Sequence, residues 1–307
     1  YIAGGGIELL GEGAIGVSLG LNGDTTIDAG TGEFSLQKGT SSTDPGGNIV
    51  SQGQGESYDL TITAGNITVP AGIGVASVGN SNLPSPELED FTINGVGQVG
   101  LNTPTVSTNG DISLNPQIRI YQDTTFISGA GAINFTGGVN NGSKALTLGD
   151  SAQTGDIFVG GLQVRHLEVG DGAFDVTFDG AMHLATNLAA PTKFLNTGNL
   201  TLIGQGSSFF GGVEALSVSQ TNIAGCVSTF GHNINLSNVT MLDSTYAARF
   251  DTRWTQTQGA PAGGGNITIS NFNTGNLNAT KSVEFDIGNG TPLSLIHISE
   301  PTRRTSI

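Results

Sequence analysis

The sequence is poor in charged residues, proline and cysteine. Of its 307 residues, 11% are charged, ten are proline and one is cysteine, Cys226. A single cysteine cannot form an intrachain disulfide, so the fold depends on side-chain packing and backbone hydrogen bonds. We expect Cys226, which lies beside Ala224 and Val227, to be a small buried residue rather than a reactive thiol.

Basic residues are especially scarce. Ten Lys and Arg stand against 25 Asp and Glu, which gives a formal net charge of −15. Because so few cations cannot neutralise a phosphate backbone, the composition argues against nucleic-acid binding and against docking on anionic lipid. No apolar run approaches the roughly 18 residues that a membrane-spanning helix needs.

Glycine is abundant, with 49 residues, and it opens a short segment that recurs along the chain. The clearest copies are GEFSL at 32–36, GNITV at 65–69, GDISL at 110–114, GAINF at 131–135, GNLTL at 198–202 and GNITI at 265–269. Apolar and polar residues alternate in each copy, which is typical of a strand with one face in the core and the other in solvent. The opening glycine permits the positive φ of a tight corner.

In the middle of the chain the apolar pairs recur at similar intervals. They are Ile133 with Phe135, Leu146 with Leu148, Ile157 with Val159, Leu167 with Val169, and Val176 with Phe178. A strand of about five residues and a turn of about five fit this interval, and two strands form a unit of roughly 20 to 24 residues, as in solenoids. The intervening residues are expected to face solvent, and they include Thr61, Ser113, Asn134, Thr147, Glu168, Asp175 and Thr268.

The repeat therefore predicts an all-β fold, a single-stranded parallel β-helix (β-solenoid). It extends over residues 1–293, which we expect to be a fragment of a longer protein. Residues 294–307, SLIHISEPTRRTSI, lack the repeat and resemble a translated sequencing adapter, so we expect this tail to be non-native.

An irregular insertion at 241–265 interrupts the repeat. It gathers the candidate binding residues Tyr246, Arg249, Phe250, Arg253 and Trp254. Aromatic side chains combined with arginine are the residue types that form binding hot spots and sugar platforms. The alternative is that the insertion packs down on the solenoid as a larger coil or cover.

Residues 129–161, GAGAINFTGGVNNGSKALTLGDSAQTGDIFVGG, resemble the repeat of filamentous-haemagglutinin-like exoproteins and related autotransporter passengers. Residues 131–135, 145–148 and 155–159 match the first three strands of that repeat. The resemblance implies a right-handed β-helix that is secreted or displayed on a Gram-negative outer membrane, by a two-partner or autotransporter route. It also implies an adhesin or structural rod acting through exposed loops, with a host or neighbouring-cell receptor or glycan and an outer-membrane transporter as partners.

The sequence offers no convincing catalytic or metal-binding group. Asp171, Asp175 and Asp179 are the best acids, but Asp175 and Asp179 would lie about 13 Å apart along a strand, too far for a glycosidase pair. None of the four histidines has a partner at metal-binding spacing; they are His166, His183, His232 and His297. We therefore predict no enzyme activity, no cofactor and no metal.

Two other functions stay open. A β-helical polysaccharide lyase or hydrolase would show carboxylates, alone or with Arg, converging within about 5 Å in a groove. A scaffold or ice-binding solenoid would show a flat, regular threonine ladder on one face.

Overall fold

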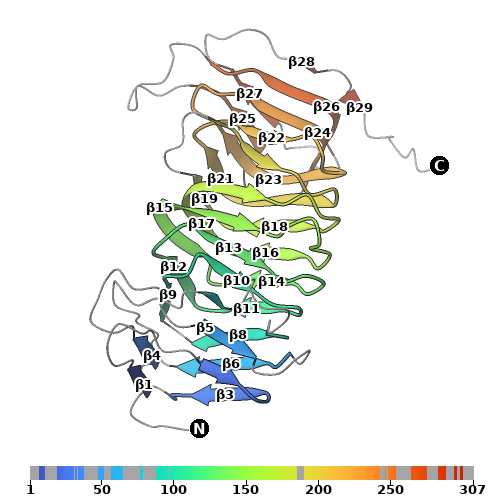
Figure 1. Cartoon of the computed structure of the whole chain (residues 1–307). Coiled ribbons are helices and arrows are strands. Elements are labelled where there is room, and N and C mark those ends of the chain that lie inside the picture. Colours follow the sequence, from blue (N-terminus) through green and yellow to red (C-terminus); the bar gives the residue numbers. More distant parts are fainter. Residues whose placement is uncertain are drawn as a thin grey trace, which may run out of the picture.

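The computed structural model describes residues 7–10, 19–30, 32, 34–37, 48–51, 57–64, 77–78, 88–95, 97–184, 190–242, 246, 248–253, 264–274, 283–287, 294–295 and 298–299. These residues form strands and no helix, so none of them belongs to a helix that could span a membrane. The strands of successive coils pair in parallel and form one 27-stranded sheet (Figure 1). The predicted all-β parallel solenoid is confirmed.

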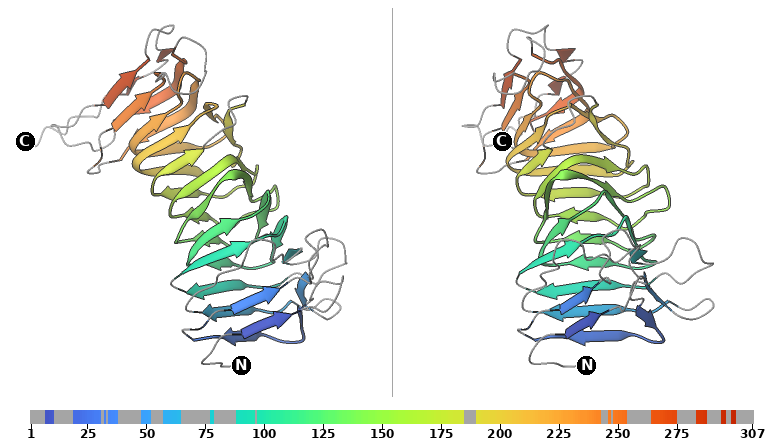
Figure 2. Two further views of the ribbon diagram at one scale, coloured as in Figure 1. Left: turned by 90° about the vertical axis from the view of Figure 1, so that its left-hand side faces the viewer. Right: turned by 60° about the vertical axis from the view of Figure 1, so that its left-hand side comes forward.

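A coil contains three strands, so the solenoid has three faces (Figure 2). In one coil, β8 (Phe91–Gly95) lies on the first face, β9 (Gln98–Leu101) on the second and β10 (Thr105–Ser107) on the third. The chain then returns to the first face as β11 (Ile112–Leu114), which pairs with β8. Hydrogen-bonded residues on the first face are 19 to 24 positions apart in the middle of the chain, as the predicted unit length requires.

The first face begins with β3 (Thr25–Asp28) and β6 (Leu60–Ala64) and continues beyond β11 through β14 (Ile133–Phe135), β16 (Ile157–Val159) and β18 (Val176–Asp179). It then includes the first halves of β21 (Asn199–Phe209) and β23 (Gln220–Ser228). The second halves of β24 (Ile234–Met241) and β26 (Ile267–Asn273) follow, with β29 (Ile298–Ser299).

The second face contains β9, β12 (Gln117–Ile120), the first halves of β15 (Val139–Leu148) and β17 (Leu162–Val169), and β19 (Met182–Leu184). The second halves of β21 and β23 follow, then β25 (Ala248–Asp251) and β27 (Val283–Asp286). The prediction of two strands per unit missed this face, because β15 and β17 each bend from the second face onto the third as one strand.

The third face contains β2 (Leu19–Leu21), β5 (Asn48–Ser51), β7 (Ser77–Val78), β10 and β13 (Thr124–Ile127). This face continues through the second halves of β15 and β17, β20 (Thr192–Phe194) and β22 (Val213–Ala215). It ends with the first halves of β24 and β26 and with β28 (Ser294–Leu295). Outside the large sheet, β1 (Ile7–Leu10) pairs with β4 (Phe34–Gln37).

The core is a continuous column of apolar side chains inside the coils. Every apolar residue of the five pairs predicted from their spacing is at most 1% exposed. The residues predicted to face solvent, from Thr61 to Thr268, are half-buried or exposed. Edge-to-face phenylalanine contacts link neighbouring positions, as between Phe126 and Phe135 at 4.8 Å. The predicted alternation is therefore correct, although the GNITV segment at 65–69 lies outside the described residues.

Aspartates stabilise the corner that precedes the first face. The Asp111 backbone N–H donates to the Asp90 carboxylate at 2.6 Å, and the Ala132 N–H donates to Asp111 at 2.8 Å. The same contact joins Asp59 to Asp24, Asp90 to Asp59, Asp175 to Asp156 and Asn199 to Asp175. Each side chain thus accepts a backbone hydrogen bond from the next coil.

Two short strands lie within the tail at 294–307. Both β28 and β29 pair with β26. The tail therefore contributes strand residues to the last described coil, and its non-native origin stays a prediction.

Candidate functional site

The insertion at 241–265 contributes a strand of the second face. Arg249 and Phe250 lie on β25, and Arg253 follows it. Tyr246, just before β25, is 36% exposed. Trp254 lies outside the described residues, so the structure places four of the five candidate residues.

Phe250 is a core residue, so its assignment to a binding surface was wrong. It is 0% exposed. Its ring stacks on Phe285 at 5.2 Å and meets Phe272 edge to face at 6.2 Å. Because β25 alternates like the other strands, Phe250 points inward while Arg249 and Asp251 point outward. In this part, the insertion packs as a larger coil, which was the alternative prediction.

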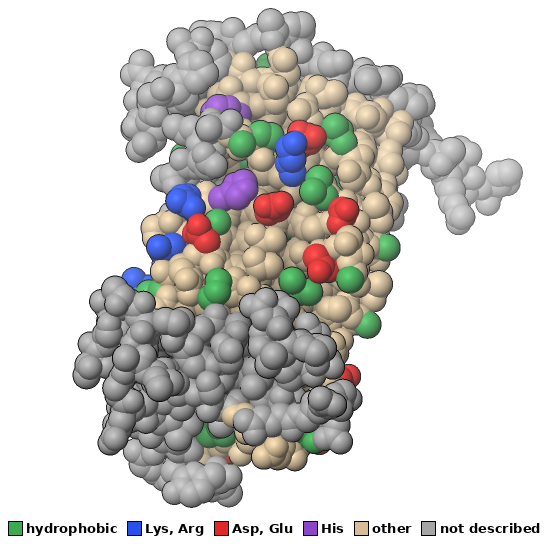
Figure 3. Space-filling model, viewed as in Figure 1, with side chains coloured by type: hydrophobic (Ala, Val, Ile, Leu, Met, Phe, Trp, Pro, Cys, Tyr) green, Lys and Arg blue, Asp and Glu red, His purple; other side chains and the backbone are tan. Residues whose placement is uncertain are grey.

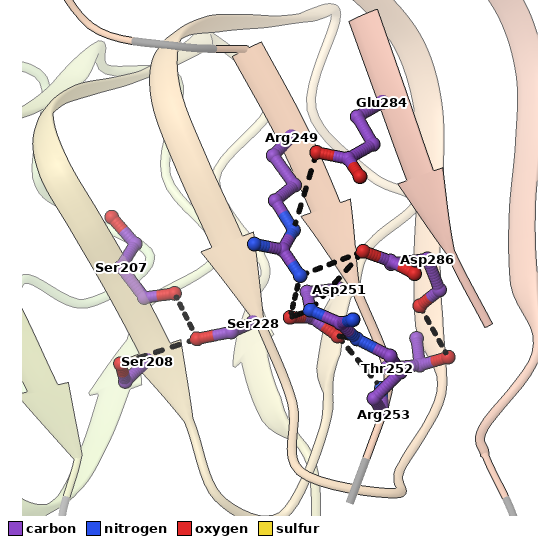
Figure 4. A network of polar contacts seen from close by, with 9 residues as sticks. All are labelled: Ser207, Ser208, Ser228, Arg249, Asp251, Thr252, Arg253, Glu284 and Asp286. Atoms are coloured by element: carbon purple, nitrogen blue, oxygen red, sulfur yellow. Dashed lines mark hydrogen bonds and ion pairs between the residues drawn. The ribbon is translucent and has the colours of Figure 1, made fainter. Parts of the chain in front are cut away.

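Arg249 is the centre of an ion-pair network on the outer side of β25 and β27 (Figure 4). Its Nη2 donates to the Asp251 carboxylate at 2.8 Å and to the Asp286 carboxylate at 2.6 Å. Its Nε lies 3.8 Å from the Glu284 carboxylate.

Arg253 completes the network from the adjoining corner. Its Nη2 lies 3.0 Å from the Asp251 carboxylate and 3.1 Å from that of Asp286. Its side chain is 44% exposed, whereas that of Asp251 is 18% exposed. We call Arg249, Asp251, Arg253, Glu284 and Asp286 the Arg249 network; three carboxylates face two guanidinium groups within it.

Burial and charge act in opposite directions in the network. Burial raises the pKa of Asp251 above its usual range although Arg249 lowers it, and Asp286 raises it further. Burial also acts against the charge of Arg249, but Asp251, Asp286 and Glu284 together raise its pKa. The guanidinium of Arg249 therefore stays charged, and Asp251 accepts a proton more readily than an ordinary carboxylate.

The Arg249 network places carboxylates beside arginine, which is part of what a β-helical polysaccharide lyase or hydrolase would need. The same nitrogen of Arg249, Nη2, donates to the carboxylates of Asp251 and Asp286, so it bridges the two acids. The sequence did not reveal this cluster, because Arg249 and Asp286 are 37 residues apart. The acids that the sequence singled out, Asp171, Asp175 and Asp179, do not belong to it.

The Asp175 side chain hydrogen-bonds the next coil. Its carboxylate accepts from the Asn199 backbone N–H at 2.7 Å and from the Asn199 side-chain amide at 3.0 Å. Asp171 and Asp179 are exposed. These contacts give Asp175 a structural role.

The described histidines lie on different elements of the solenoid. His166 on β17 and His232 in a corner are half-buried, and His297 lies outside the described residues. His183 lies on β19. Among the described residues, no group of three or more His, Cys, Asp or Glu side chains could hold a metal ion.

Cys226 is half-buried rather than buried, so that prediction was wrong. It lies on β23 beside Arg249 of β25. Burial raises the pKa of its thiol, although Arg249 opposes the shift.

The first face carries a polar ladder that is not a regular threonine ladder. Thr26, Thr61 and Thr92 occupy one outward column on successive coils. The column then continues as Ser113, Asn134 and Phe158. The regular array that an ice-binding face would need is therefore not present along this described column.

The corner between the second and third faces carries an aromatic pair that the sequence prediction missed. The rings of Phe210 and Phe230 stack with centroids 4.2 Å apart and planes 8° apart. Both side chains are half-buried. The available signal was a Phe-Gly step after an apolar strand, at 210–211 and again at 230–231.

Comparison with known proteins adds no relative: no family model matches the chain, and neither a curated protein nor a solved structure matches it. The fold defines the chain as a parallel β-solenoid.

Proposed function

We propose that the chain is an adhesive or structural rod of a bacterial surface, exported as a passenger of the filamentous-haemagglutinin or autotransporter kind. The observation that carries this proposal is the stack of parallel coils, in which each backbone ladder continues into the next coil. Such a stack is extended and displays corner residues along its length. Its proposed partners are a receptor or glycan on a host or neighbouring cell and, during export, an outer-membrane transporter.

The outer surface supports a role in the extracellular space. In the view of Figure 3, charged side chains are scattered and uncharged polar groups and backbone cover most of the described surface. The net charge of −15 favours solubility and mutual repulsion of rods. A chain with one cysteine can be exported unfolded without a premature intrachain disulfide.

The test of this function is adhesion by the purified full chain. Beads coated with the chain are expected to adhere to epithelial or bacterial cells, saturably and in competition with soluble chain. Albumin-coated beads are the control. Adhesion no greater than that control, on every cell type and surface glycan tested, would contradict the proposal.

A β-helical enzyme acting on acidic polysaccharide is the second candidate, because the Arg249 network places carboxylates beside guanidinium groups. Its test measures new reducing ends and unsaturated products from uronic-acid polysaccharides. An enzyme would lose at least about 100-fold activity in Asp286→Asn, with Asp111→Asn, from the distant backbone ladder, as the control. No products from the wild-type chain would eliminate this candidate.

A further inference from the structure

Basic side chains gather at one corner of the solenoid. The basic residues in the described part of the chain are Arg119, Lys144, Arg165, Lys193, Arg249 and Arg253. The first three belong to β12, β15 and β17, strands of three successive coils, near the corner between the second and third faces. Figure 3 shows Lys and Arg side chains along the left edge of the described surface, where β12 and β15 lie in Figure 1.

The three side chains converge on the turn between β12 and β13. The Cζ atom of Arg119 lies 5.3 Å from the centroid of the Tyr121 ring. Two residues further on, the Asp123 carboxylate lies 3.2 Å from Nη2 of Arg165. The same carboxylate accepts from the backbone N–H of the residue after Lys144 at 2.8 Å. Two guanidinium groups and one ammonium group are therefore placed around a single turn.

This corner carries a surplus of positive charge. Asp123 forms an ion pair with Arg165, and within the described part of the chain neither Arg119 nor Lys144 has an ion pair. The two arginines of the Arg249 network, in contrast, face three carboxylates. The side chains of Arg165 and Asp123 are 45% and 61% exposed, so their ion pair contributes little to stability and a ligand carboxylate can take the place of Asp123.

Amide side chains lie beside the cations on the second face. The Gln98 side-chain amide donates to that of Gln117 at 3.0 Å, and Gln117 is two residues before Arg119. On the next coils, Asn140 of β15 pairs in register with Gln163 of β17. Amides both donate and accept hydrogen bonds, as the hydroxyl groups of a sugar require. A nucleic acid is a poorer ligand, since three cations are too few to neutralise a phosphate backbone.

We propose that the corner formed by Arg119, Lys144 and Arg165 binds a polysaccharide that carries carboxylate groups. The inference rests on the proposed adhesive function, to which it adds a site and a ligand class. Charge complementarity identifies the class, because guanidinium groups bind carboxylates and Arg165 already holds one. The negative charge elsewhere on the chain acts weakly at this corner, since exposed charges are screened beyond about 8 Å at physiological ionic strength.

The test uses single-charge variants of the full chain. Arg119→Gln and Arg165→Gln each remove one cation from the corner. Lys193→Gln is the matched control, because Lys193 is an exposed cation of β20 on the third face. Asp123→Asn removes the competing carboxylate but keeps an acceptor oxygen for the backbone N–H that follows Lys144. Binding is measured on immobilised polygalacturonate and on its neutral methyl ester, with dextran sulfate, polyglutamate and single-stranded DNA as other polyanions.

The wild type and Lys193→Gln are expected to bind polygalacturonate but not its methyl ester, with an affinity that falls as salt is added. Arg119→Gln and Arg165→Gln should each lose at least about fivefold in affinity, and Asp123→Asn should gain at least about threefold. The melting temperatures of all variants should stay within about 2 °C of wild type, because the changed side chains are exposed.

Four results would overturn the inference: no binding to polygalacturonate, equal binding to its ester, tighter binding to another of the polyanions, or a loss in Lys193→Gln equal to that in the corner variants. If wild-type beads adhere to cells without any binding to polygalacturonate, the adhesive function stands and the corner site fails. If polygalacturonate binding depends on the corner while the beads do not adhere to cells, the site stands and the adhesive function fails.

Discussion

At the scale of single residues, the corner aspartates have a defined structural task. Each accepts a backbone hydrogen bond from the next coil, and the row lines one edge of the first face. The sequence shows Asp or Asn directly before most first-face strands, but alternation alone does not tell a backbone acceptor from a solvated acid. The close approach of like charges is the cost of this arrangement.

Asp175 tests the structural task directly. Asp175→Ala removes the acceptor of two Asn199 donors and is expected to lower the melting temperature by about 2–4 °C. Asp175→Asn keeps an acceptor oxygen for the backbone N–H and should change it less. Asp171→Ala, at an exposed neighbouring acid, is the control for lost charge. Equal losses in the Ala variants, measured by circular dichroism, would show that the Asp175 contacts contribute nothing specific.

The raised pKa of Asp59 makes the stability of the fold depend on pH. Burial and the neighbouring Asp90 and Asp24 raise its pKa above the ordinary value of 3.8. Since the folded state then binds the proton more tightly than the unfolded state, this group lowers stability as pH rises from 3.8 through the folded pKa. Thermal unfolding between pH 4 and pH 7 should therefore show a smaller decline in stability with rising pH in Asp59→Asn than in the wild type. Identical pH profiles would contradict the assignment.

At the scale of elements, β21 and β23 pass from the first face to the second at glycines with positive φ, Gly204 and Gly225. β23 crosses from the first face to the second at Gly225, where φ is +134° and an added Cβ would overlap the Gly204 carbonyl oxygen. Gly206 on the neighbouring β21 has no atom within 4 Å of an added Cβ. The two positions therefore differ sharply in the room that they offer.

Gly225→Ala is expected to lower the free energy of unfolding by about 1–3 kcal/mol, because both the backbone and the neighbouring coil oppose a side chain. Gly206→Ala should be neutral or slightly stabilising, since it restricts the unfolded chain. Chemical denaturation of both variants checks this pair. A loss in Gly206→Ala as large as that in Gly225→Ala would show that the bend is not the cause.

The sequence predicts some of these elements better than others. Strands such as β14, β16 and β18 follow from alternation and from glycine at their entry. The first halves of β15 and β17 escaped prediction, because they continue around a corner into strands already assigned.

The Arg249 network could not be predicted from spacing. Its residues meet because β27 pairs with β25, and the coil between the two strands is longer than its neighbours: Asp251 pairs with Asp286, 35 residues on. Because the coil length varies, the spacing of residues in the sequence does not predict which residues pair on neighbouring coils. The inward position of Phe250 could be read from alternation within β25 alone, once that strand is recognised.

At the scale of the whole molecule, the coils build an extended body with a continuous apolar core and backbone ladders along each face (Figure 2). Contacts within such a body join neighbouring coils, so stiffness does not depend on distant pairings. The Arg249 network lies on the outer side of the second face, with Arg253 at the adjoining corner, and the Phe210–Phe230 pair lies at the corner between the second and third faces.

Small-angle X-ray scattering of the purified chain tests the central claim, the solenoid rod, most directly. A compact globular protein of 307 residues would have a radius of gyration of about 19 Å. The solenoid predicts a clearly larger value, with a pair-distance distribution that peaks at the width of the rod and falls slowly toward its length. A symmetric distribution with a radius of gyration near the compact value would contradict the account.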